Sequence, residues 1–230
     1  LGTKLRIFTR GLPIKLIKKR GGYLGGEETC VCEVIEGKRP EPRIKPPFPT
    51  HSGIWGCPTL INNVETFYWV ARIARDEYAG RRFYSISGDV KNPGNFELPE
   101  KMSIEKILRQ TGNWPRFSFF VQAGGTSGEI LLSNELKRPV SGVGGIIVFR
   151  KKETDPLALM RRFSVFFMQH NCDKCTPCRE GVFRIVEMLN AGALDKRTLG
   201  HIFYTLEQTS LCGLGKGVVV PLKGIIKKLF

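Results

Sequence analysis

NCDKCTPCRE, residues 171–180, and SLCGLGKG, residues 210–217, are the two stretches from which the fold of this sequence can be worked out. The first places three cysteines with two residues between neighbours, and the second adds a fourth after a long interval. Three thiolates in one turn, closed by a fourth from a distant loop, are typical of a [4Fe–4S] cluster, which takes one thiolate per iron. The predicted ligands are Cys172, Cys175, Cys178 and Cys212.

Two other interpretations of these cysteines stay open at this point. A structural zinc ion also accepts four thiolates, but zinc sites usually pair one C-x2-C knuckle with a second two-ligand knuckle, whereas the distribution here is three plus one. Four unrelated buried cysteines are the remaining alternative. Pro177 would stiffen the turn, and the glycines after Cys212 would leave backbone N–H groups free to face cluster sulfur.

Helical segments surround the cysteines. DPLALMRRFSVFFMQHN begins with Asp155 and Pro156, which are typical of a helix start, and GVFRIVEMLNAG ends in Gly192. KRTLGHIFYTLEQTS and VVVPLKGIIKKLF are two more amphipathic segments. Short connections between such segments predict a small helical bundle, so residues 151–230 are expected to form a helical [4Fe–4S]-binding domain.

Residues 82–150 have a different pattern. RFYSISGDV predicts a strand, VKNPGNFELP a turn and a second strand, and SIEKILRQTG a short helix with Ser103 as its N-cap and Gly112 after its end. FSFFVQAGG and GGIIVFR are further strands. This order predicts a small α+β domain of the β-grasp kind.

Residues 1–81 are expected to form a third part. IKLIKK alternates apolar and basic residues, as a half-exposed strand does, and GGYLGGEET follows as a glycine-rich turn. Six prolines between residues 38 and 59 predict an extended loop without regular helix. Residues 60–80 are expected to form a helix with a broad apolar face and with Asn62 or Asn63 near its start.

Composition excludes several classes of protein. The chain has 230 residues, with 41% hydrophobic and 25% charged, which is ordinary for a globular protein. Since no apolar run approaches the ~18 residues of a membrane span and no export leader is visible, we expect no membrane insertion and a cytoplasmic or matrix-facing location. The three other cysteines, Cys30, Cys32 and Cys57, are interpreted as buried small apolar residues.

The net charge of +15 is concentrated at the two ends of the sequence. Residues 1–26 hold seven basic residues and no acid, and the last fifteen residues hold four basic residues and no acid. Such a field favours acidic partners. No nucleic-acid-binding module is recognisable, so the basic ends are interpreted either as a solvated face or as a docking surface for an acidic electron-transfer protein. The N-terminal basic residues are Lys4, Arg6, Arg10, Lys15, Lys18, Lys19 and Arg20, and the C-terminal ones are Lys216, Lys223, Lys227 and Lys228.

Six motifs in one order carry a family resemblance: GGYLGGEET, RIKPPFP, GIWGCPTLINNVET, YSISGDVKNPGNFELP, CDKCTPCREG and SLCGLG. Together they resemble the flavin-containing, NADH-oxidising (51 kDa-type) subunit of respiratory complex I and its relatives in NAD-linked hydrogenases and formate dehydrogenases. The resemblance covers the chain from about residue 15 to its end. It implies an α/β flavin domain, here residues 1–81 as a partial domain, a ubiquitin-like β-grasp (SLBB-like) domain over 82–150, and the helical iron–sulfur domain over 151–230.

The resemblance also implies cofactors, partners and site residues. NADH would pass a hydride to FMN, which would release electrons singly to the cluster and on to a partner, such as an iron–sulfur subunit of the 24 kDa, thioredoxin-like ferredoxin type. Gly26, Glu27 and Glu28 match the family's acidic segment beside flavin and nicotinamide. Asn62 and Asn63 match an asparagine pair near the flavin's phosphate side, and the four cysteines match the cluster ligands.

One departure leaves two function classes open. The family's glycine-rich GRGGxGFP-type loop, which holds the flavin phosphate and NADH, does not precede Gly21 in this sequence. The chain is therefore expected to lack the first half of the flavin domain. Either it is part of an NADH-dehydrogenase flavoprotein, an enzyme subunit, or it is a non-catalytic iron–sulfur electron-transfer or docking module that no longer binds flavin or NADH.

Overall fold

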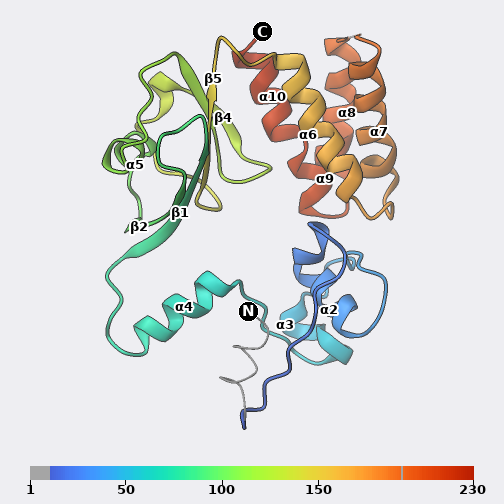
Figure 1. Cartoon of the computed structure of the whole chain (residues 1–230). Helices are drawn as coiled ribbons and strands as arrows, with labels where there is room; N and C mark the ends of the chain where they lie inside the picture. The colour runs from blue at the N-terminus through green and yellow to red at the C-terminus, as the bar shows by residue number, and fades with distance from the viewer. Residues whose placement is uncertain (1–10, 193) are drawn as a thin grey trace. The chain divides into compact units, whose positions relative to one another are not determined.

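The computed structural model describes residues 11–192 and 194–230, and Figure 1 shows the order of its elements along the chain. Contacts between residues divide the chain into two compact units, Leu1–Ile61 and Asn62–Phe230. The three-part division expected from the sequence stays a prediction. In the described part of the chain, no helix has both the length and the apolar character that crossing a bilayer requires.

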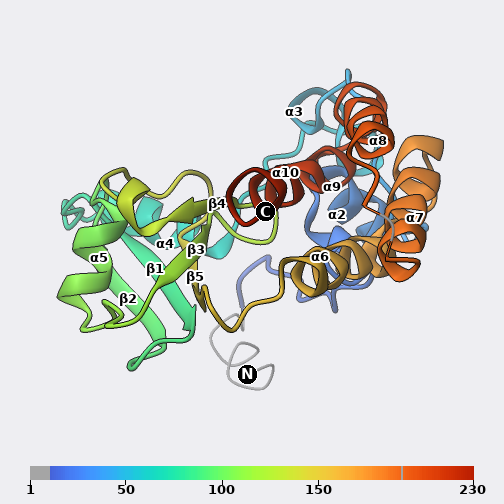
Figure 2. The same ribbon diagram turned by 90° about the horizontal axis from the view of Figure 1, so that it is seen from above.

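A five-stranded sheet forms one half of the second unit (Figures 1 and 2). Its strand order is β2-β1-β5-β3-β4, with β1 and β5 parallel and all other neighbours antiparallel. A single helix, α5, follows the first hairpin, and Ser103 caps it as expected. The mixed sheet confirms the predicted α+β fold class. The elements are β1 (Arg81–Gly88), β2 (Gly94–Pro99), α5 (Ile104–Gln110), β3 (Phe119–Ala123), β4 (Glu129–Leu132), η3 (Ser133–Glu135) and β5 (Gly145–Arg150).

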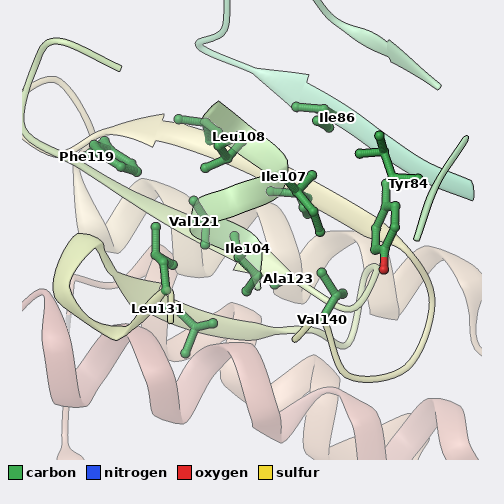
Figure 3. Packing of buried hydrophobic residues seen from close by; sticks show 14 residues of the cluster. Tyr84, Ile86, Ile104, Ile107, Leu108, Phe119, Val121, Ala123, Leu131 and Val140 are labelled. Atoms are coloured by element: carbon green, nitrogen blue, oxygen red, sulfur yellow. The ribbon is translucent and has the colours of Figure 1, made fainter. Parts of the chain in front are cut away.

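The core of this half lies between α5 and one face of the sheet (Figure 3). Ile104, Ile107 and Leu108, spaced three and four apart, bring one stripe of α5 into the core and have no exposed surface. Alternate residues of each strand meet this stripe, because successive side chains of a strand point to opposite faces. On β3 these residues are Phe119, Val121 and Ala123.

Five helices form the other half of the second unit. Asp155 caps α6 by accepting a hydrogen bond from the N–H of Leu157, and Asp195 caps α8 in the same way from Arg197. The predicted helical segments are all present, and α9 is an additional short turn of helix that was not predicted. The helices are α6 (Pro156–His170), α7 (Thr176–Asn190), α8 (Lys196–Thr209), α9 (Gly213–Gly217) and α10 (Val219–Lys228).

Helix α10 joins the two halves of the second unit by packing on β4 (Figure 2). A side chain at Gly224 would place its Cβ only 2.9 Å from the Cβ of Ile130, so a glycine permits the close approach of helix and strand. The Nζ of Lys228 donates to the carbonyl oxygen of Ile130 at 2.8 Å and pairs with Glu135 at 2.7 Å. The sheet and the bundle therefore share a packed interface.

Helix α4 (Val64–Ile73) is attached to β1 through Glu65. One carboxylate oxygen of Glu65 accepts the backbone N–H of Phe83 at 2.8 Å and the indole N–H of Trp69 at 3.3 Å. Trp69 also stacks on Phe83, with ring centroids 5.6 Å apart. The apolar face predicted for this helix is present in sequence, but no residue of α4 is buried in the structure.

The first unit contains short helices and loops: η1 (Leu24–Gly26), α2 (Glu28–Ile35), α3 (Pro49–Ser52) and η2 (Ile54–Gly56). The strand predicted for residues 14–19 is wrong, because these residues are exposed and belong to no sheet. The proline-rich segment was expected to exclude helix, yet it holds α3 and η2. Pro49 occupies the first turn of α3, where a missing N–H is not needed for an intrahelical bond.

Arg43 holds the proline-rich segment against α2. Its guanidinium donates to Glu33 at 2.5 Å, to Glu36 at 2.7 Å and to the carbonyl oxygen of Gly53 at 2.7 Å. Glu36 also accepts the backbone N–H of Trp55 at 2.8 Å. Hydrogen bonds from Lys38, Arg43 and the Trp55 N–H lower the pKa of the Glu36 carboxyl from 4.5 to about 2.

Candidate metal centre

The three clustered cysteines lie where α6 ends and α7 begins. Asn171 ends α6 and makes the turn: its side chain donates to the carbonyl oxygen of Met168 and accepts the N–H of Asp173 at 2.7 Å. Asp173 has a positive φ of 59°, a conformation that aspartate tolerates better than most residues. The turn places Cys172 before α7, Cys175 at its N-cap and Cys178 in its first turn.

The fourth cysteine lies at the start of another helix. Cys212 is the N-cap of α9, two residues after Ser210 ends α8. The backbone N–H groups of Leu214 and Gly215, in the first turn of α9, act to lower the pKa of the Cys212 thiol. Both α8 and α9 pack against α7, which carries Cys178. The bundle thus brings residues 34 positions apart in the sequence into one neighbourhood.

The other three thiols lie close enough to Cys178 to affect the pKa of its thiol. Burial raises the pKa of the Cys178 thiol to about 12, and the thiols of Cys175, Cys212 and Cys172 contribute to this rise. Burial likewise raises the pKa of Cys212, against the opposing effect of the backbone N–H groups of Leu214 and Gly215. Without a metal the sulfurs of Cys178 and Cys212 keep their protons, so binding of a metal or cluster must release these protons.

The donor set fits an iron–sulfur cluster. All four cysteines are free thiols, and soft thiolate ligands select Fe–S clusters or zinc over harder ions. Over residues 11–192 and 194–230, however, no group of three or more histidine, cysteine, aspartate or glutamate side chains is arranged to hold a metal ion. Convergence of the four sulfurs would therefore accompany loading, and their assignment as ligands stays a prediction.

The remaining cysteines divide into two kinds. Cys30 and Cys32 lie on α2 with no exposed surface, in agreement with their interpretation as small apolar residues. Cys57 was expected to be buried as well, and this is wrong: it is exposed in the loop after η2. Because Cys57 is exposed, it serves as a control residue for chemistry at the other cysteines.

Part of the acidic segment expected near flavin stabilises the local fold. Glu27 is the N-cap of α2, and one of its oxygens accepts the backbone N–H groups of Thr29 and Cys30, each at 2.9 Å. Lys45 pairs with both acidic residues, at 2.8 Å from Glu27 and 2.5 Å from Glu28. Burial works against a low pKa for Glu27, but the bonds from Lys45 and Thr29 lower that pKa overall.

The other predicted flavin residues differ in whether they also have a structural role. A Cβ at Gly26 would have only the Lys19 Nζ within 4 Å, at 3.7 Å, so packing does not require a glycine there. Asn63 is the N-cap of α4, where its Oδ1 accepts the N–H of Thr66 at 2.8 Å. Asn62 precedes this cap and is exposed. Gly26, Glu27 and Glu28 lie in the first unit, and both asparagines lie in the second.

Several residues that matter in these two regions were not found from the sequence. Arg43 and Lys45 lie in the RIKPPFP motif but were given no individual role, because the sequence does not show which distant acidic residues they contact. Ser210 was also missed as a candidate. The available signal was its position in the SLCGLG motif, two residues before Cys212.

Comparison with known proteins identifies relatives of this chain. Residues 158–229 match the family model of the NADH-ubiquinone oxidoreductase-F iron–sulfur binding region. The chain is 33% identical over 240 residues to NADH dehydrogenase [ubiquinone] flavoprotein 1, mitochondrial, of Dictyostelium discoideum, covering 90% of this chain and 50% of that protein. It is 34% identical over 246 residues to an NADH-quinone oxidoreductase subunit of Rickettsia typhi, covering 93% of this chain and 58% of that protein.

A solved structure is similar to this chain in both fold and sequence. A chain of an NAD⁺-reducing [NiFe]-hydrogenase in the H2-reduced state superposes with a TM-score of 0.82 at 30% identity, over 89% of this chain and 40% of that chain. The resemblance inferred from the six motifs is confirmed by these matches. The chain spans 50% and 58% of the lengths of the two curated relatives named above.

Proposed function

Since residues 158–229 of this chain belong to the iron–sulfur binding region of the NADH-ubiquinone oxidoreductase family, we propose that the chain is the electron-transfer part of an NADH-dependent oxidoreductase subunit. It passes electrons from NADH, through FMN, to a [4Fe–4S] cluster and on to a partner subunit. The observation that carries this proposal is the position of Cys172, Cys175, Cys178 and Cys212 at the starts of the neighbouring helices α7 and α9.

The residues around the cysteines suit a negatively charged cluster. The four thiolates would hold the irons, and the N–H groups of Leu214 and Gly215, which act to lower the pKa of the Cys212 thiol, would favour negative charge at its sulfur. Cys175 and Cys178 lie at the N-terminus of a fifteen-residue helix, whose dipole also favours negative charge. Cys178 is only 6% exposed, which keeps water away from the cluster on that side.

The flavin side of the proposal uses the family-motif residues named above. FMN, when bound, converts a two-electron hydride transfer into single-electron steps. Gly26 would allow close approach of a ligand, Glu28 would present a half-exposed carboxylate next to Lys45, and Asn62 would offer an amide to the flavin. Glu27 and Asn63 would position this region through the caps that they provide to α2 and α4.

We expect the 230-residue chain alone to bind FMN weakly and not to pass electrons from NADH to its cluster at an enzyme's rate. A buried phosphate needs several N–H donors or cations, and the glycine-rich phosphate loop of the family is not part of this sequence. Joined to the N-terminal half of a relative, the chain should accept electrons from NADH, and Glu28→Gln should slow this step without changing iron content. The measurement is cluster absorbance during an anaerobic NADH titration with FMN present.

Direct reduction by dithionite is the control, because it bypasses flavin and nicotinamide. Glu153→Gln, an exposed change in the second unit, should behave like the unaltered chain. Rapid bleaching by NADH with the chain alone would show that residues 1–81 hold a self-sufficient flavin site. A loaded cluster that dithionite reduces, but that NADH does not reduce even in the joined protein, would favour the non-catalytic electron-transfer module instead.

For the partner, we propose an acidic iron–sulfur subunit of the 24 kDa, thioredoxin-like ferredoxin type. Within residues 11–26, Lys15, Lys18, Lys19 and Arg20 are exposed and no acid accompanies them, whereas Lys4, Arg6 and Arg10 lie outside the described residues. At the other end of the chain, Lys223 and Lys228 are engaged in ion pairs with Glu207 and Glu135. The N-terminal basic segment is therefore the stronger docking candidate.

Binding of such a partner should weaken steeply as salt rises, because exposed charges are screened beyond ~10 Å at 0.1 M ionic strength. The dissociation constant can be measured by fluorescence anisotropy between low and physiological salt. Replacing Lys15, Lys18 and Lys19 with glutamine should weaken binding, and the same change at exposed Lys151 and Lys152 should have little effect. Affinity that does not depend on salt would contradict docking through this segment.

A further inference from the structure

Ser210 has a buried hydroxyl group with no hydrogen-bond partner. The residue is 5% exposed, and its Oγ is one of two buried hydroxyl oxygens without a partner among the described residues; the other belongs to Ser164. The backbone N–H of Ser210 is satisfied, because it donates to the carbonyl oxygen of Leu206 at the end of α8. A buried hydroxyl left unpaired costs about 1–3 kcal/mol, so a partner for Ser210 should exist in the working protein.

The Ser210 hydroxyl lies beside the predicted cluster ligands. A Cβ added at Gly215 would lie 2.5 Å from the Oγ of Ser210 and 3.2 Å from the Cβ of Cys178. Gly215 itself lies in α9, three residues after Cys212. Because Gly215 has no side chain, the Ser210 hydroxyl fits beside it. This position is close to two predicted ligands, Cys178 and Cys212.

We propose that Ser210 donates a hydrogen bond to sulfur of the [4Fe–4S] cluster, at a thiolate of Cys178 or Cys212 or at an adjacent sulfide, and thereby raises the reduction potential of the cluster. The inference rests on the proposed function, since it requires a cluster on these cysteines. A hydrogen bond to sulfur is stronger when the cluster is reduced, because the reduced cluster carries one more negative charge. Ser210 thus favours acceptance of the electron.

The test is a redox titration of the full chain, followed by electron paramagnetic resonance of the reduced cluster. Ser210→Ala should shift the equilibrium between reduced and oxidised cluster about tenfold toward the oxidised form, which is ~59 mV for one electron. It should also remove one exchangeable-proton coupling from the spectrum of the reduced cluster. Ser164→Ala deletes the other unpaired buried hydroxyl and should leave the potential unchanged.

A second variant covers the case in which Ser210→Ala does not assemble a cluster. Ser210→Thr keeps a hydroxyl and should hold both the wild-type potential and the exchangeable-proton coupling. The inference is overturned if Ser210→Ala binds four irons with an unchanged potential, or if Ser210→Thr loads with a shifted one. If the unaltered chain purified without oxygen binds no iron, the proposed function itself fails, and the two failures are thereby distinguished.

Discussion

Replacing Cys175 with serine is expected to lower the iron content from about four per chain to near zero. A [4Fe–4S] cluster needs one thiolate per iron, and a serine hydroxyl is a much poorer ligand for iron. Cys175 is also the N-cap of α7, so its position is defined by the helix start. Iron and sulfide analysis and visible absorbance of anaerobically purified protein measure the result.

Cys57→Ser is the matched control for this substitution. Cys57 is exposed and lies in the first unit, so the variant should keep full iron content and the same absorbance. A Cys175→Ser variant that retains four irons would remove this residue from the ligand set. If the unaltered protein, purified without oxygen, contains stoichiometric zinc and no iron, the four cysteines bind a structural zinc ion and not a cluster.

Replacing Arg43 with methionine should destabilise the first unit by about 3 kcal/mol. The change removes the guanidinium from Glu33 and Glu36, whose side chains are only 14% and 5% exposed, and leaves Glu36 with Lys38 as its ion-pair partner. Removal of one partner from a buried ion pair typically costs about 3–5 kcal/mol, and the partial exposure of Arg43 favours the lower end. Hydrogen exchange of the amides in α2, followed by mass spectrometry, should become about 100-fold faster.

The control is Arg39→Met, which removes a largely exposed arginine from the same segment. It should leave exchange in α2 unchanged, and neither variant should affect exchange in α5 of the second unit. Faster exchange in both units after Arg43→Met would show a general loss of folding rather than a local one. Unchanged exchange in α2 would show that the proline-rich segment is held by other contacts.

The same ion-pair network predicts how the first unit responds to acid. The pKa of Glu36 is about 2 in the folded protein and about 4.5 in an unfolded chain. Its stabilising contribution is therefore complete above pH 4.5 and is lost as the pH falls toward 2. In Arg43→Met part of the lowering of this pKa disappears, so the acid-dependent loss of protection in α2 should be smaller than in the unaltered protein.

Local sequence patterns were enough to predict most helices and strands of the second unit. The segments RFYSISGDV and FSFFVQAGG predicted β1 and β3, and Ser103 was the predicted cap of α5. For α4, Asn62 or Asn63 was expected near the helix start, and the structure shows that Asn63 is the cap. These predictions hold because strand and helix periodicity and N-capping depend on residues within a few positions of each other. The strand predicted for 14–19 failed for a related reason: a strand also needs a neighbour to take its hydrogen bonds, and alternation alone cannot supply one.

Spacing and periodicity, which are properties of short stretches, were sufficient to identify the four clustered cysteines as candidates, the α+β pattern of residues 82–150 and the helical character of residues 155–230. Which distant groups meet depends on how the whole chain packs. The tertiary structure paired Arg43 with Glu33 and Glu36, and it placed Lys45 between Glu27 and Glu28. It also left the hydroxyl of Ser210 buried beside Gly215. Whether a buried polar group finds a hydrogen-bond partner depends on the residues that pack around it. These residues are distant in the sequence, so no local pattern predicts the contact.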